Sequence, residues 1–368
     1  MVAPYSASFQ MRRTCFLLVL LALWLGTPLL ACTVVRFNVD GHPIVARNHD
    51  WPFGEGMLIV NQRGIIKTAL SPLNPKRWTS QYGSVSFVQF GREIPFAGMN
   101  ERGLTVDLLQ LPDAQFPPPD PAKVSVNVIQ WVQYQLDTSA TVEDVIASLG
   151  DVVPAPVLPA IERVHYFVTD ASGDVAIIEF LGGQAVVQHG NAASQCALAN
   201  STWDQSSSRL TEPDAVGSSE RRYVEAVKAI GQVGDHSGPQ AQIEFAFATL
   251  DRVAQYELTQ WSLVYEPTER RIWFRTRVAP QRRWIDLDDV SFDSGNGPLG
   301  LDINADLAAD VVMHLSPYTP EHNQRVVHFA FDWLMPAGLA RSAVKQLVLS
   351  YPETLKTGSA AVQPSATK

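Results

Sequence analysis

The sequence has few cysteines, no clustered basic residues and no histidines at metal-ligand spacing. It holds three cysteines in 368 residues, and its 28 lysines and arginines against 37 aspartates and glutamates give a formal net charge of −9. Because no run of Lys and Arg forms a stripe, nucleic acid is a poor candidate for a partner. The eight histidines show no spacing such as H-x-x-x-H, which argues against a metal site. No Ser-His-Asp pattern stands out either, so the usual serine hydrolase arrangement is not indicated.

One long apolar segment is present, and it lies at the start of the chain. Arg12 and Arg13 precede an apolar stretch that continues through Ala31, with Pro28 near its end. This is the charge and small-residue pattern of a secretory signal, so residues 1–31 are predicted to be a signal peptide. A membrane anchor is the alternative, because the run is nearly long enough to span a bilayer. The signal peptide predicts an exported protein, periplasmic or secreted. No later segment is that apolar, so we expect no stable membrane span after processing.

The rest of the chain is predicted to contain strand hairpins separated by helices. The order is strands, helices, strands, helices, and the strands arrive as hairpins rather than as βαβ units, which favours an α+β fold with antiparallel sheets and segregated helices. We expect one domain over residues 32–351 and a mobile polar tail over residues 352–368. Strands are predicted at 33–39, 43–49, 57–62, 84–90, 94–99, 104–111, 164–169, 175–181, 262–265 and 271–275. Helices are predicted at 124–149, 220–230, 243–256 and in parts of 326–351.

Cleavage between Ala31 and Cys32 would make Cys32 the first residue of the mature protein. A free α-amine has a pKa of about 7.7–8.0, so much of it is neutral near neutral pH. A neutral amine beside a thiol can take the thiol proton and later pass it to a leaving group. One residue then supplies both the nucleophile and the general base.

Such a cysteine needs a cation near its sulfur and a carboxylate near its amine. Arg47 and Asp50 lie at the end of the strand that follows Asp40-Gly41, a hairpin turn signal that folds this end back towards Cys32. Residues three apart face opposite sides of a regular strand, so the strand must end or bulge there if both side chains reach the site. An exposed ion pair near a strand end is the alternative, and the spacing alone does not decide between them.

Four motifs in order resemble the choloylglycine hydrolase family, which includes penicillin V acylases and conjugated bile salt hydrolases among the N-terminal nucleophile hydrolases. Each motif is weak alone, but their order behind a processed cysteine is fairly specific, and the resemblance covers the chain from Cys32 to about Asp293. The motifs are Cys32-Thr33 with Arg47-Asn48-x-Asp50-Trp51, then Gly98-Met99-Asn100-Glu101-Arg102-Gly103-Leu104, then Leu198-Ala199-Asn200-Ser201, then Gly217-Ser218-Ser219-Glu220-Arg221-Arg222-Tyr223.

The resemblance implies a role for each matching residue. Cys32 would be the nucleophile and amine base, Arg47 would lie by the sulfur, and Asp50 would hold the amine. Asn200 would offer its side-chain amide to the oxyanion. Arg222 would brace the site electrostatically.

Three positions complicate this assignment. Gln110 stands where the family has Asn or Tyr and uses the backbone N–H for the oxyanion, a donor that does not depend on the side chain. Ala199 replaces the usual Thr before Asn200. Arg221 and Arg222 compete for the bracing role, and Arg222 is preferred because Tyr223 matches the aromatic residue that follows in the family.

The resemblance also implies a four-layer αββα sandwich, with two antiparallel sheets between helix layers, and hydrolysis of a linear amide through a thioester. No metal or organic cofactor is expected, the partner would be a small-molecule amide substrate, and relatives are often homotetramers. Phenoxyacetyl amides, bile acid conjugates and N-acyl homoserine lactones are the amides that relatives cleave. The signal peptide favours the first and the last of these.

Two alternatives would leave Cys32 without catalytic chemistry. The segment Leu29-Leu30-Ala31-Cys32 fits a bacterial lipobox, and lipidation would block both the sulfur and the amine. A disulfide between Cys32 and Cys196 would instead staple the fold. Either alternative describes a non-enzymatic exported binding protein.

Some residues outside the motifs are candidates for the rim of a substrate cleft. The proline-rich loop 112–121 follows Gln110 directly and is either the rim of the cleft or an ordinary surface loop. Residues 294–368 lie beyond the resemblance and receive no role. Five aromatic residues are candidates for an acyl pocket or for simple core: Trp51, Trp78, Phe116, Trp131 and Trp203.

Overall fold

The structure is a computed structural model, and it describes residues 32–39, 41–71, 73–159, 162–190, 196–211, 217–233, 236 and 238–358. These residues belong to one compact unit, Ala31–Lys368. The predicted signal peptide, residues 1–31, lies outside the described residues.

The first sheet contains strand β1, and Cys32 lies directly before that strand. Its seven strands run in the order β14-β1-β2-β15-β16-β17-β19, antiparallel except for the short pairing of β17 with β19. The hairpin of β1 and β2 sets Thr33 opposite Asn48, which brings Cys32 beside the end of β2. The strands are β1 (Thr33–Val39), β2 (His42–Asp50), β14 (Ala197–Leu198), β15 (Thr259–Glu266), β16 (Arg271–Thr276), β17 (Arg283–Asp286) and β19 (Ala309–Asp310).

The second sheet has nine strands and is antiparallel throughout its described pairings. Its order is β13-β12-β11-β8-β7-β6-β3-β18-β20. The strands are β3 (Met57–Asn61), β6 (Ser84–Val88), β7 (Pro95–Asn100), β8 (Thr105–Gln110), β11 (Val164–Thr169), β12 (Val175–Leu181), β13 (Gln184–His189), β18 (Leu299–Asp302) and β20 (Ser316–Pro317). Two small sheets join β9 (Val124–Asn127) to β10 (Val152–Ala155), and β4 (Ile65–Thr68) to β5 (Arg77–Thr79) and β21 (Lys356–Thr357).

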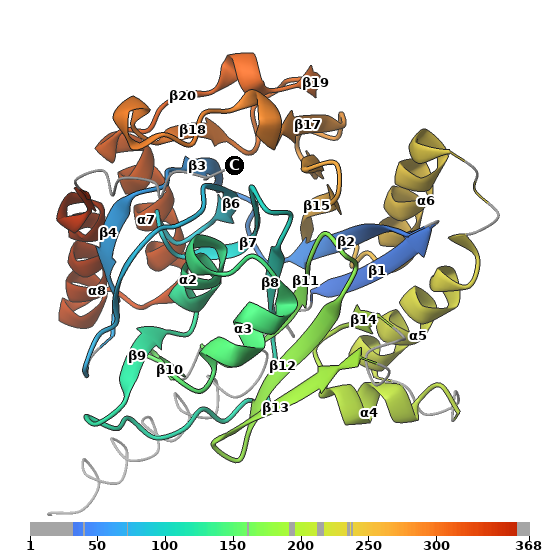
Figure 1. The fold of residues 1–368 in the computed structure, drawn as a ribbon, viewed down its shortest axis with the longest axis horizontal. Coiled ribbons are helices and arrows are strands. Elements are labelled where there is room, and N and C mark those ends of the chain that lie inside the picture. The colour runs from blue at the N-terminus through green and yellow to red at the C-terminus, as the bar shows by residue number, and fades with distance from the viewer. Residues whose placement is uncertain are drawn as a thin grey trace, which may run out of the picture. The chain divides into compact units, whose positions relative to one another are not determined.

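Helices lie outside the two main sheets, and apolar side chains fill the space between the sheets. Phe87 of the second sheet meets Phe274 of the first edge to face, with ring centroids 5.9 Å apart. Helices α5 and α6 pack on β1, β2 and β15, whereas α2 and α3 pack on β7, β8 and β12 (Figure 1). The predicted α+β fold with two antiparallel sheets between helices is therefore confirmed. The helices are α2 (Gln130–Thr138), α3 (Val142–Ser148), α4 (Trp203–Ser208), α5 (Ser218–Ile230), α6 (Pro239–Arg252), α7 (Pro320–Leu334) and α8 (Leu339–Ser350), with 3-10 turns η3 (Leu287–Asp289), η4 (Ser294–Asn296), η5 (Val312–His314) and η6 (Tyr351–Thr354).

The segment predicted as one helical stretch, residues 124–149, begins instead with a strand. Val124–Asn127 forms β9, and α2 starts only at Gln130. The Asn127 side chain accepts hydrogen bonds from the backbone N–H groups of Ile129 and Gln130, which ends the strand and starts the helix. A second helix of this stretch, α3, begins after Thr141, which caps it in a capping box with Asp144.

The C-terminal part forms a helical hairpin, α7 and α8, at the edge of the second sheet (Figure 1). The chain then continues through η6 into β21, which pairs with β4, within the segment where the sequence predicts a polar tail. Residues 359–368 lie outside the described part. No helix within the described ranges has the length and apolar character needed to cross a membrane.

Candidate active site

Cys32 lies directly before β1 and is buried, with 5% of its surface exposed. Its sulfur is 3.9 Å from Nη2 of Arg47 and accepts a hydrogen bond from the backbone N–H of Asp50. Cys32 carries a free thiol, so the alternative with a Cys32–Cys196 staple receives no support. Burial raises the pKa of this thiol, while the positive charges of Arg47 and Arg222 act in the opposite direction.

Arg47 is fully buried and has acceptors on both terminal nitrogens. Nη1 donates to the carbonyl of Phe96 at 2.5 Å and to Oδ1 of Asp107 at 3.2 Å, and Nη2 donates to the carbonyl of Leu108 at 3.0 Å. A buried guanidinium keeps its charge only when it is paired in this way. The cation predicted to lie beside the sulfur is therefore held rigidly by β7 and β8.

Asp50 ends β2, and the strand that pairs with it is irregular at that point. The register of β15 against β2 shifts between Thr259 and Trp261, so the predicted bulge occurs in the partner strand. Oδ1 of Asp50 accepts from the Thr259 hydroxyl at 2.6 Å, and Oδ2 accepts from the Gln255 amide at 3.3 Å. Burial raises the pKa of Asp50 to about 6, despite these hydrogen bonds.

His49 is part of this arrangement and was not predicted. Arg47 has only donors, so Nδ1 of His49, 3.3 Å from Nη2 of Arg47, must be the acceptor. Nε2 then carries the proton and donates to Oε1 of Gln89 at 3.1 Å. Burial and the charge of Arg47 lower the pKa of His49 to about 3, which keeps the ring neutral.

Arg222 joins the start of β1 to Asn200. Its Nη1 donates to the carbonyl of Cys32 at 2.5 Å and to the Thr33 hydroxyl at 2.6 Å, and Nη2 donates to Oδ1 of Asn200 at 3.0 Å. Arg222 is buried whereas Arg221 is exposed, so the structure brings Arg222 to the site, as preferred from the sequence.

The orientation of the Asn200 amide follows from its neighbours. Because Arg222 can only donate, the Asn200 oxygen must face it, and Nδ2 therefore faces the carbonyl of Gln110 at 2.6 Å. This contact uses one of the two N–H groups on Nδ2 and leaves the second for another acceptor. Gln110 thus contacts the site through its carbonyl, and the predicted use of its backbone N–H stays a prediction.

A buried histidine and glutamate support the segment that holds Asn200. Nε2 of His165 is 2.8 Å from the carbonyl of Ala199, and its Nδ1 is 3.1 Å from Oε1 of Glu179, which also accepts from the backbone N–H of Trp203. The His165 ring thus links the Ala199 carbonyl to the Glu179 carboxyl, and Glu179 links it in turn to the start of α4. Nothing in the sequence motifs pointed to these residues.

Asp107 is another residue that sequence reasoning missed. It lies on β8 between apolar neighbours, pairs with Arg47, and accepts from the Tyr265 hydroxyl at 3.4 Å. Burial raises its pKa to about 6. A single carboxylate in an otherwise apolar strand, Thr105-Val106-Asp107-Leu108-Leu109, is the signal that could have found it.

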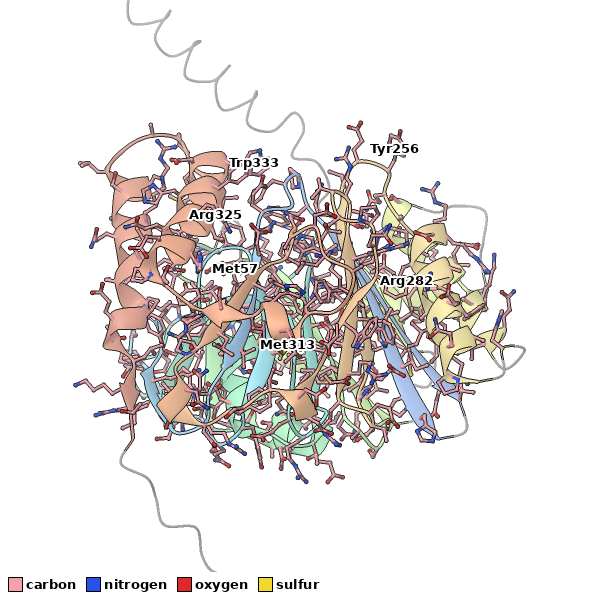
Figure 2. All side chains as sticks on the ribbon, turned by 90° about the horizontal axis from the view of Figure 1, so that it is seen from above. Met57, Tyr256, Arg282, Met313, Arg325 and Trp333 are labelled. Atoms are coloured by element: carbon pink, nitrogen blue, oxygen red, sulfur yellow. The ribbon has the colours of Figure 1, made fainter. Side chains whose placement is uncertain are left out.

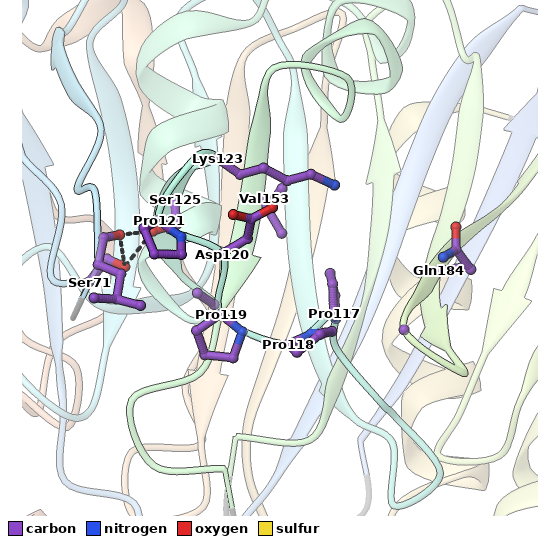
Figure 3. Close-up of a pocket in the computed structure, with 13 residues that line it drawn as sticks. Ser71, Pro117, Pro118, Pro119, Asp120, Pro121, Lys123, Ser125, Val153 and Gln184 are labelled. Atoms are coloured by element: carbon purple, nitrogen blue, oxygen red, sulfur yellow. Dashed lines mark hydrogen bonds between the residues drawn. The ribbon is translucent and has the colours of Figure 1, made fainter.

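The proline-rich loop contributes to a separate pocket. This pocket has a volume of about 390 Å³ and none of the six predicted site residues lines it. Figure 3 shows Pro117, Pro118 and Pro119 on one side and Ser71 and Gln184 on others. The pocket therefore gives no support to the interpretation of loop 112–121 as the rim of the Cys32 site.

Among the five candidate aromatics, Trp51 is the one whose described ring contacts reach the site. Its ring lies 6.1 Å from that of His49. The other four pair with rings elsewhere: Trp78 with Tyr134, Phe116 with Phe180, Trp131 with Tyr166 and Trp203 with Tyr223.

The arrangement offers a buried thiol, two arginines and a pair of oriented amide and carboxylate groups, which suits attack on an acyl carbon. In the described part of the chain, no group of three or more His, Cys, Asp and Glu side chains is placed to hold a metal ion.

Comparisons with known proteins find relatives in sequence and in fold. A penicillin V acylase from Pectobacterium atrosepticum is 28% identical over 338 aligned residues, which cover 78% of this chain and 89% of the relative. The fold matches the structure of penicillin V acylase from Agrobacterium tumefaciens, with a TM-score of 0.68 and 23% identity over 78% of this chain and 98% of that chain. It also matches a conjugated bile acid hydrolase variant from Clostridium perfringens, with a TM-score of 0.63 and 19% identity over 76% of this chain and 100% of that chain.

The family model for linear amide C–N hydrolases of the choloylglycine hydrolase family matches residues 32–226, more than half of the chain, and starts at the buried cysteine. All six predicted site residues lie within that match: Cys32, Arg47, Asp50, Gln110, Asn200 and Arg222. The chain therefore belongs to the choloylglycine hydrolase family of linear amide C–N hydrolases.

Proposed function

We propose that the protein hydrolyses its amide with Cys32 as an N-terminal nucleophile, after an exported precursor loses residues 1–31. The observation that carries this proposal is the contact set at Cys32: Arg47 by the sulfur, Arg222 on the carbonyl, and Asp50 at the end of the paired strand. The family match beginning at Cys32 supports the same start for the mature chain.

Because the pKa of the Cys32 thiol is raised, the reaction needs a base, and the α-amine serves as that base. Because burial disfavours the thiolate, the thiol does not ionise on its own at neutral pH and needs a nearby base. The neutral α-amine of a processed Cys32 takes the thiol proton, and the Asp50 carboxylate orients the resulting ammonium. The positive charge of Arg47 then stabilises the thiolate.

The reaction proceeds in two halves. The thiolate attacks the acyl carbon, and the oxyanion accepts the remaining N–H of Asn200 Nδ2. The ammonium then protonates the leaving amine, the C–N bond breaks, and a thioester forms. In the second half the amine deprotonates a water molecule, which attacks the thioester and releases the carboxylic acid and the thiol. Loss of one oxyanion donor would cost about 2.7–4 kcal/mol of barrier.

For the substrate we propose an N-acyl amide with an apolar acyl group, as cleaved by a penicillin V acylase, in preference to a bile acid conjugate. The Pectobacterium relative, 28% identical, is a penicillin V acylase. The rings of Trp51 and Phe96 lie against His49, next to Arg47. We further propose export to the periplasm or medium and assembly into a homotetramer.

The test combines the mass of the exported protein with its activity. The mature chain is expected to begin at an unmodified Cys32, and Cys32→Ser is expected to lower kcat/KM on phenoxyacetyl amides by about 10³-fold or more. Cys196→Ser is the matched control, because it changes the other described cysteine and should leave the activity in place. A lipid-modified Cys32, a different first residue, or full activity of Cys32→Ser would refute the mechanism.

A further inference from the structure

The two residues predicted to bind the oxyanion come from different sheets. Asn200 follows β14, an edge strand of the first sheet, whereas Gln110 ends β8 in the second sheet. The side-chain amide of Asn200 donates to the carbonyl of Gln110 at 2.6 Å, so the site joins the two sheets. Its geometry therefore depends on what fixes the Asn200 segment relative to the second sheet.

His165 connects the second sheet to the peptide that precedes Asn200. It lies on β11, which pairs with β8 along its whole length and sets His165 opposite Leu109. Because the carbonyl of Ala199 can only accept, Nε2 of His165, 2.8 Å away, donates to it. His165 thus ties the peptide between Ala199 and Asn200 to the neighbour strand of β8.

Glu179 holds both the ring of His165 and the far end of the same segment. Its Oε1 lies 3.1 Å from Nδ1 of His165 and accepts from the backbone N–H of Trp203 at 2.9 Å. Both side chains are buried beside the core residues Ala199 and Trp203. An apolar pair would fill this space at a lower desolvation cost, but it could not fix the direction of a peptide group. The polar pair therefore indicates that the direction of this peptide matters.

Ser219 holds the same peptide by its N–H group. It lies at the start of α5, in the yellow helical layer beside the first sheet (Figure 2). Its hydroxyl oxygen accepts from the backbone N–H of Asn200 at 2.8 Å. The C=O and N–H of a trans peptide point in opposite directions, so His165 and Ser219 together fix its plane. The backbone of Asn200 is thereby held independently of the contacts that its side-chain amide makes.

We propose that His165, held by Glu179, and Ser219 are positioning residues that aim the Asn200 amide at the acyl oxygen. They act through Asn200 and take no part in making or breaking bonds. The proposal rests on the proposed function, in which Asn200 binds the oxyanion formed when the Cys32 thiolate attacks. Because the oxygen gains its charge only on the way to the tetrahedral intermediate, loss of aim should lower kcat more than it raises KM.

The test measures kcat and KM on the 4-nitroanilide of phenoxyacetic acid. His165→Leu is expected to lower kcat about 10- to 100-fold, part of the loss of about 10²–10³ that follows removal of an oxyanion donor. KM should change by less than about threefold. His165→Gln, whose Nε2 amide can reach the same carbonyl, should recover most of the activity.

Ser219→Ala tests the same peptide without a substitution in the core, because Ser219 is partly exposed. It should lower kcat about 2- to 10-fold, as for the loss of one hydrogen bond. Ser208→Ala is the matched control on α4, where the Ser208 hydroxyl donates within its own helix to the carbonyl of Gln205. It should leave kcat unchanged.

A double-mutant cycle with Asn200→Ala separates positioning from a general structural role. Without the Asn200 amide there is nothing left to aim, so His165→Leu and Ser219→Ala should cause no further loss of kcat. Equal losses with and without the Asn200 side chain would overturn the proposal, as would an unchanged kcat in both single variants.

Crystal structures of the parent and the two single variants measure the positioning without turnover. The distance from Asn200 Nδ2 to the Gln110 carbonyl, 2.6 Å here, should lengthen in His165→Leu and in Ser219→Ala. A parent that cleaves no amide, together with this displacement in the variants, would refute the proposed function alone. An Asn200 amide that stays in place in both variants would overturn the positioning role, whatever the activity of the parent.

Discussion

Two clusters of buried charges in the described part of the chain can be compared, one beside the thiol of Cys32 and one around Lys67. At the site, Arg47 pairs with Asp107 at 3.2 Å and faces the Cys32 sulfur at 3.9 Å. Elsewhere, Lys67 pairs with Glu93 at 2.5 Å and Asp137 at 2.9 Å. Burial of charge alone therefore does not identify an active site.

The two clusters differ in what their cations face. Lys67 has two carboxylates, and Asp137 also accepts from the Trp78 indole and the Gln133 amide. Arg47 has one carboxylate, and its Nη2 also lies 3.9 Å from a thiol with a raised pKa. Among the described residues, Lys67 faces no group that can act as a nucleophile, whereas the charge of Arg47 favours the ionised form of the thiol beside it. Substitutions in each cluster test this difference.

The largest effect is expected at Arg47, because it serves both purposes. Arg47→Met leaves Asp107 buried without its partner, which should lower the free energy of unfolding by about 3–5 kcal/mol. It also removes the charge that favours the thiolate, so kcat/KM should fall about 10- to 1,000-fold, as for a pKa change of 1–3 units. Urea unfolding and kinetics on folded protein measure the two losses.

A second substitution separates the loss of stability from the loss of activity. In the double variant Arg47→Met with Asp107→Leu no buried charge is left unpaired, so stability should recover while activity does not. Recovery of activity together with stability would mean that Arg47 acts only on the fold.

The next effect is expected at Lys67 and concerns stability only. Lys67→Met leaves Asp137 buried without a cation and leaves Glu93 with only Arg92, 3.6 Å away, so the free energy of unfolding should again fall by about 3–5 kcal/mol. Activity per folded molecule should match the parent, measured at a urea concentration and temperature where the variant is folded. A loss of kcat comparable to that of Arg47→Met would remove the distinction between the two clusters.

The sequence predicted the cluster at Arg47 better than the cluster at Lys67, because local signals bring together more of its residues. Cys32, Arg47 and Asp50 lie on one hairpin, whose turn and alternation are local signals, so their proximity follows from short-range rules. Lys67 of β4 and Asp137 of α2 are 70 residues apart in the chain, and no short pattern encodes that contact.

The difference between local and long-range contacts also explains which predictions were wrong and which site residues were missed. The strand Val124–Asn127 is followed almost directly by α2, so its residues were included in the helical stretch predicted from the apolar spacing that comes after it. Asp107 and Thr259 complete the site from strands far away in sequence, and only the register of the sheets brings them to Arg47 and Asp50.

The smallest effect, and the most discriminating, is the pH dependence contributed by Asp50. Its pKa is raised from 3.8 to about 6 by burial. As the pH falls through 6, Asp50 takes up a proton and no longer orients the amine, so kcat/KM should lose about tenfold per pH unit from this group. Stability responds with the opposite sign: the folded protein binds this proton more tightly than the unfolded chain, so the contribution grows as the pH falls from about 6 towards 3.8 and is lost as the pH rises through 6. The slope is about 1.4 kcal/mol per pH unit.

Asp50→Asn should remove both responses, leaving low activity without this acid limb and a flatter dependence of unfolding free energy between pH 4 and 6. Asp107, with its pKa also raised to about 6, contributes a similar stability slope, so the decisive quantity is the difference between Asp50→Asn and the parent. Parallel changes of activity and stability with pH would show that Asp50 is a structural carboxylate like those around Lys67. Opposite changes are what a group ionised for catalysis at the expense of folding must give, because the carboxylate is held in a place where burial favours its neutral form.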